Sequence, residues 1–132
     1  AGRAASALIV ALQHDGSAAA QATELGAVAP LVALLDVGSV ADPSDVSDAA
    51  GALGMIAYGS QAGAAEAFEA GGLRPLLALL TTGCPGGRSI GDVETDGICR
   101  NNAAGALIAV CRGNAEHSAA ADRKSTRLTP VT

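Results

Sequence analysis

The side chains most able to bind a metal or act as nucleophiles are Cys84, Cys99, Cys111, His14 and His117. No two of these cysteines form a CxxC pair, and the two histidines stand far apart in the sequence. A structural zinc site needs four ligands with short local spacings. We therefore expect no metal site and no catalytic Cys–His pair. Cys111 is expected to be a small core residue, and the other two cysteines to be free thiols in a reducing compartment.

A glycine-rich segment, Gly-Cys-Pro-Gly-Gly-Arg-Ser at residues 83–89, could suggest a phosphate-binding loop. Such a loop follows a β-strand and carries a lysine at a fixed spacing. This segment has no lysine and follows a Leu-rich helical pattern. We interpret it as part of an insertion, a long loop over residues 81–97, which could contact a partner. We expect no cofactor and no small-molecule ligand.

Several of the acidic residues gather in two short segments, residues 42–48 and 92–96, each ahead of an Ala-rich segment of a predicted long helix. Carboxylates at the first turn of a helix are stabilised by the helix dipole. Both segments therefore predict helix starts, and no carboxylate pair is placed for acid–base chemistry. The sequence indicates a protein that is not an enzyme.

Composition narrows the class of protein further. The chain has 132 residues, 49% of them apolar and 16% charged, with a formal net charge of -5. This much apolar content argues against a disordered chain, and the acidic balance argues against nucleic acid as a partner. The longest apolar runs are far shorter than the roughly 20 residues of a membrane span, and no signal peptide is recognisable. We expect a cytoplasmic protein, which could also be nuclear, without membrane insertion.

An internal repeat organises the chain. Ala-Ala-Ser-Ala-Leu at residues 4–8 recurs as Ala-Ala-Gly-Ala-Leu at 49–53 and again at 103–107, with offsets of 45 and 54 residues. A second anchor repeats the 45-residue offset, because residues 26–35 and 71–80 share the pattern Gly-x-x-x-Pro-Leu-x-x-Leu-Leu. Two independent anchors with one offset predict a unit that stacks on copies of itself.

Each unit is expected to contain three helices. In the first, helices are predicted over residues 4–13 and 18–25, with a third beginning near Pro30. Ser17 and Ser60 are expected to cap helices, and Gly26 and Gly71 to end them. Residues 42–45, Asp-Pro-Ser-Asp, predict the start of a long helix, with Asp42 as its cap.

This pattern resembles the armadillo repeat, through the glycine turn before Pro-Leu-x-x-Leu-Leu and the Ala-Ala-x-Ala-Leu segment of a long helix. The resemblance implies an all-α fold, a right-handed α-solenoid of three-helix repeats, over residues 1–121. The units would span 3–47, 48–97 and 98–121, the last of them truncated. Residues 122–132 depart from the pattern, and we expect a disordered tail there.

In armadillo proteins the long helices line a concave groove that binds extended peptides. Nuclear-import members clamp the peptide with Trp and Asn, but the Trp positions fall here on Ser6, Gly51 and Gly105. The Asn positions fall on Val10, Met55 and Ala109. The resemblance therefore implies a shallower groove without these clamps. Its candidate residues are Gln13, Met55, Tyr58, Arg100, Asn101, Asn102, Ala109 and Arg112.

For Tyr58 two interpretations stand: an exposed anchor for a partner, or a half-buried helix end. The function that the resemblance implies is a non-catalytic scaffold or adaptor for protein partners. Alternatives are the substrate-recognition module of a larger ubiquitin ligase, a nuclear-import receptor, an enzyme using residues brought together across the groove, and a structural spacer.

Overall fold

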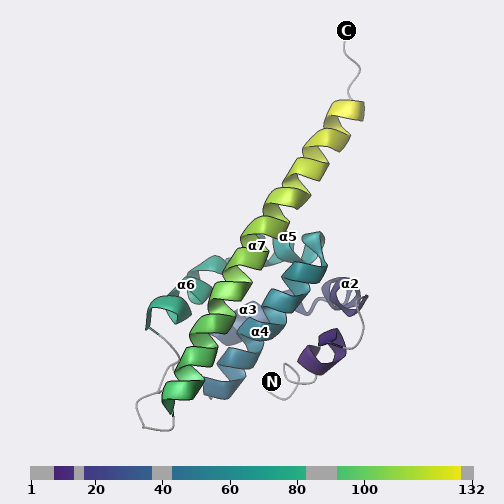
Figure 1. Cartoon of the computed structure of the whole chain (residues 1–132). Coiled ribbons are helices and arrows are strands. Elements are labelled where there is room, and N and C mark those ends of the chain that lie inside the picture. Colours follow the sequence, from purple (N-terminus) through teal and green to yellow (C-terminus); the bar gives the residue numbers. More distant parts are fainter. Residues whose placement is uncertain (1–7, 14–16, 37–42, 83–91, 129–132) are drawn as a thin grey trace.

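A computed structural model describes residues 8–13, 17–36, 43–82 and 92–128, and every element within these ranges is a helix (Figure 1). Residues 8–13 form a short helical segment. The remaining helices are α2 (Ala18–Glu24), α3 (Val28–Asp36), α4 (Pro43–Gly59), α5 (Gln61–Glu69), α6 (Leu73–Thr82) and α7 (Asp92–Leu128). The expected all-α class is confirmed for this part of the chain.

The turns that follow α2 and α5 have the same geometry, 45 residues apart. Gly26 and Gly71 have φ values of 79° and 82°, a left-handed conformation that favours glycine. The amide of Gly26 donates to Thr23 O (3.1 Å), and that of Gly71 donates to Phe68 O (3.1 Å). A second hydrogen bond, which spans five residues of sequence, closes each turn. The amide of Ala27 donates to Ala22 O (3.0 Å), and that of Gly72 donates to Ala67 O (2.9 Å). Both turns are Schellman motifs, which is why each helix ends there.

The helix starts agree with the predicted caps only in part. Ser60 is extended, and its hydroxyl accepts a hydrogen bond from the amide of Gly63 (3.0 Å), as a serine N-cap does. Ser17 occupies the N-cap position of α2, but its side chain makes no capping bond. Asp42, the predicted cap of α4, lies outside the described residues.

We call α2, α3 and α4 the first trio and α5, α6 and α7 the second trio. In the first trio α2 and α3 pack on α4; in the second, α5 and α6 pack on α7 in the same way. Between the trios, α4 lies alongside α7, and α3 contacts both α5 and α6 (Figure 1). One hydrophobic core runs through both trios. Its largest fully buried side chains are Val28, Val46, Leu53, Ile56, Leu76, Cys99 and Val110.

Two glycines let the long helices approach the short ones. A Cβ at Gly59 would come within 2.6 Å of the Ala19 methyl, and a Cβ at Gly113 would overlap the Ala64 methyl. Ala19 and Ala64 are 45 residues apart, and the two glycines are 54 apart, so the close approach recurs at both repeat offsets. Glycine is required at both positions because the facing surface leaves no room for a side chain.

Two regions differ from the sequence-based expectation. The loop expected at 81–97 is shorter, because α6 continues to Thr82 and α7 begins at Asp92. Residues 92–96 therefore form the first turns of α7. The tail expected to be disordered from residue 122 is helical as far as Leu128. Strong helix formers at residues 119–121, with no glycine or proline from 114 to 128, favour that extension. Figure 1 shows the end of α7 projecting beyond the other helices.

The close contact at Gly113 generates a stability prediction. Gly113→Ala should lower the free energy of unfolding by about 1 kcal/mol or more, since overpacking typically costs about 1–3 kcal/mol. Chemical denaturation followed by circular dichroism measures this. The matched control is Gly97→Ala, also in α7, where a Cβ meets nothing within 4 Å. The control should be stabilised by up to about 1 kcal/mol. Equal effects at the two positions would contradict the packing.

Candidate functional site

A groove of about 750 Å³ runs along the seam between α4 and α7. Small residues form much of its floor, and two of them bring the helices together. A Cβ on Gly54 would lie only 3.2 Å from the Cα of Ala106. The residues that line the groove are Leu12, Ala19, Gly51, Gly54, Met55, Tyr58, Gly59, Asn101, Asn102, Ala104, Gly105, Ala106, Ile108 and Ala109.

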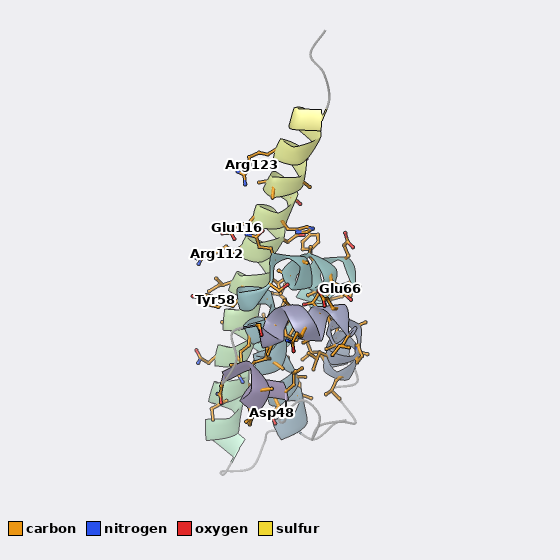
Figure 2. The ribbon with its side chains drawn as sticks, turned by 90° about the vertical axis from the view of Figure 1, so that its right-hand side faces the viewer. Asp48, Tyr58, Glu66, Arg112, Glu116 and Arg123 are labelled. Carbon is orange, nitrogen blue, oxygen red and sulfur yellow. The ribbon has the colours of Figure 1, made fainter. Side chains whose placement is uncertain are left out.

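A second recess of about 360 Å³ continues from the groove and shares Tyr58, Gly105, Ile108 and Ala109 with it. Its rim is polar. The Gln61 amide Nε2 donates to Glu116 Oε2 at 3.0 Å, which ties the start of α5 to α7. Arg112 also lines this recess, and Figure 2 shows Tyr58, Arg112 and Glu116 on the same side of the molecule. The combined surface is apolar along the seam and charged at one end.

The largest side chains of the groove are open to solvent. Tyr58 is 85% exposed and Ile108 is 59% exposed. The half-buried interpretation of Tyr58 is therefore wrong, and its role as an anchor stays a prediction. A tyrosine combines a large apolar ring with a polar hydroxyl, and such side chains dominate binding energy when a partner covers them.

The two neighbouring asparagines of α7 differ in role. Asn102 Nδ2 donates to both the carbonyl oxygen and the Oγ of Ser47, at 3.1 Å each. Ser47 is buried, so this pair fastens α7 to α4 inside the structure. Asn101 is exposed on the groove wall. Of the two, Asn101 is the more exposed to solvent.

Six of the eight candidate groove residues line the groove or the recess: Met55, Tyr58, Asn101, Asn102, Ala109 and Arg112. Two do not. Arg100 Nη1 donates to Leu80 O (3.0 Å) and Thr81 O (3.2 Å) at the end of α6, where a cation stabilises free carbonyls. Gln13 is exposed, outside both cavities.

Sequence reasoning missed Ile108, Gln61 and Glu116. Ile108 aligns with Gly54 of the previous long helix, so the repeat gave no signal for a large side chain there. The Gln61–Glu116 bond joins residues 55 positions apart. Its two ends lie on different helices, and no local pattern marks them as partners.

The cysteines require two corrections. Cys99 is buried and disulfide-bonded, not a free thiol; Cys84 lies outside the described residues. Cys111 is a free thiol but is exposed, not part of the core. Ala57, at the equivalent position of α4, is buried, whereas no described helix covers Cys111. Within the described ranges, no three His, Cys, Asp or Glu side chains are grouped to hold a metal ion.

Among the described helices, none is by itself long and apolar enough to cross a membrane; α2 and α3 reach that length and hydropathy only as a pair bent by 84°. Comparisons with known proteins add no relative: no family model, no curated protein and no solved structure matches the chain.

The asparagine pair generates a prediction that separates structural from surface roles. Asn102→Ala should lower the free energy of unfolding by about 1–2 kcal/mol, because it leaves the buried Ser47 hydroxyl without this donor. Asn101→Ala, the adjacent control, should change it by less than about 0.5 kcal/mol. Urea denaturation of the three proteins measures both. If the two variants were equally stable, the assigned role of Asn102 would be wrong.

Proposed function

We propose that this chain is a protein-interaction scaffold that binds an extended segment of a partner protein in the groove between α4 and α7. The observation that carries the proposal is an exposed tyrosine and an exposed isoleucine beside a long apolar seam. Exposed apolar surface of this kind, with a polar rim, is typical of interaction sites. The groove and recess are open along the helices, which suits an extended chain.

We further propose that the helices belong to an armadillo-type solenoid. In support, the Schellman turns at Gly26 and Gly71 recur with the 45-residue offset, and each trio packs its short helices on its long one. In such an arrangement successive long helices lie side by side and share one face. The seam between α4 and α7 is where that shared face would bind a partner.

The charged residues at one end of the groove indicate which side chains a bound partner segment should place there. Arg112 and Glu116 lie within two turns of α7 beside Tyr58. A partner segment with apolar side chains along the seam and a carboxylate near Arg112 would complement this end. The planar guanidinium of Arg112 can donate two parallel hydrogen bonds to such a carboxylate.

The groove can be tested with peptides selected for binding to the wild-type protein from a displayed random library. The double variant Tyr58→Ala/Arg112→Ala should weaken binding of the selected peptides about tenfold or more, because truncating an aromatic or arginine anchor costs at least about 1–2 kcal/mol. Fluorescence anisotropy of labelled peptides gives the Kd values.

The matched control is Leu25→Ala, which removes an exposed side chain (86% exposed) outside the groove. Its peptide affinity and that of the wild type should agree within about twofold, a difference worth only about 0.4 kcal/mol. Peptides that bind the double variant as tightly as the wild type, or a selection that yields no specific binder, would refute the groove as the binding site. Circular dichroism confirms that both variants remain helical.

A further inference from the structure

The helices α3 and α6 each carry two apolar faces, and these faces are buried to different degrees. We call one of them the back face. On α3 it consists of Val28, Val32 and Leu35, all buried. The positions 45 residues later on α6 are Leu73, Leu77 and Leu80, of which Leu77 is 54% exposed and the other two are half-buried. The back face is therefore covered in the first trio and open in the second.

The opposite face shows the reverse pattern. We call it the front face; in the first trio it consists of Ala27, just before α3, and of Pro30 and Leu34 on α3. Pro30 is exposed and the other two are half-buried. The equivalent residues beside and on α6 are Gly72, Pro75 and Leu79, all buried. The front face is open in the first trio and covered in the second.

The reason is that the front face of the second trio packs on the back face of the first. The two helices α3 and α6 are in contact, and a Cβ on Gly72 would lie 3.3 Å from Val32 Cγ2. A front-face residue of the second trio, just before α6, thus meets a back-face residue of α3. The described residues contain one complete interface of this kind.

The long helices repeat the pattern. Leu53 and Ala57 on α4 are buried, and α7 lies against this helix. The residues 54 positions later on α7, Leu107 and Cys111, are half-buried and exposed respectively. The open surface of the second trio therefore includes residues of both α6 and α7.

We propose that this surface binds a second copy of the chain, head to tail. The occupant is the front face of α3 of the second copy, seated on the back face of α6 of the first. Within one chain a front face already packs on a back face, at Gly72 and Val32. Two copies of the chain can therefore offer each other the same pair of faces. Such an interface is heterologous and does not close, so further copies can add at each end.

This self-association goes beyond the proposed groove function and can be tested apart from it. Pro30 and Leu77 line neither the groove nor the recess. Pro30→Glu alters only the front face, and Leu77→Glu alters only the back face. Both introduce the same charge, so the altered faces cannot attract each other. Leu25→Glu is the matched control, because Leu25 and its equivalent Ala70 are exposed in both trios.

Sedimentation velocity of the full chain over a wide concentration range measures the association. The wild type and Leu25→Glu should show a mass that rises with concentration above that of the 12.8 kDa monomer. Each face variant alone should remain monomeric. An equimolar mixture of Pro30→Glu and Leu77→Glu should form a heterodimer of twice the chain mass that does not grow further, since only one pair of intact faces remains.

Three results would overturn the proposal. One is a wild type that stays monomeric at every concentration. Another is a Pro30→Glu protein that still dimerises alone, since this requires two back faces to meet. The last is a mixture of the two variants that forms no heterodimer although circular dichroism shows both to be folded.

Discussion

Close approach of helix backbones at glycine and alanine is the constraint on which this structure depends. The chain has one Tyr, one Phe and no Trp, so large side chains cannot fill space between distant helices. The helices instead come close enough for small residues to touch. Gly59 lies against Ala19, Gly113 against Ala64, and Gly54 against Ala106. Leucine, isoleucine and valine then fill the remaining core.

The same constraint shapes the groove. Because Gly54 and Ala106 bring α4 and α7 together at the seam, side chains beside the contact point outward instead of meeting across it. Met55, Tyr58 and Ile108 line the resulting surface, and two of them remain largely in solvent. The close packing of α4 on α7 and the exposure of the large side chains beside this contact therefore both follow from the way the two helices pair. The Asn102–Ser47 hydrogen bonds add a polar connection to that pairing.

The sequence predicted features that depend on neighbours along the chain. Gly26 and Gly71 end helices as expected, and Ser60 caps α5. Met55 and Tyr58 were expected on the groove from the resemblance to the armadillo repeat, and both line it. The partners of Arg100 and Asn102 could not be predicted, since hydrogen bonds across 20 or 55 residues depend on how helices pack. The exposure of Cys111 likewise depends on what covers α7.

The central claim is that the close glycine–alanine contacts that hold the short helices on the long ones recur at matching offsets in the two trios. Nuclear Overhauser effects between alanine methyl groups and glycine α-protons test it most directly. The structure predicts two such effects, one between Ala19 and Gly59 and one between Ala64 and Gly113. Observation of both would support the equivalence of the trios. Detection of only one, or of neither in a folded protein, would contradict it.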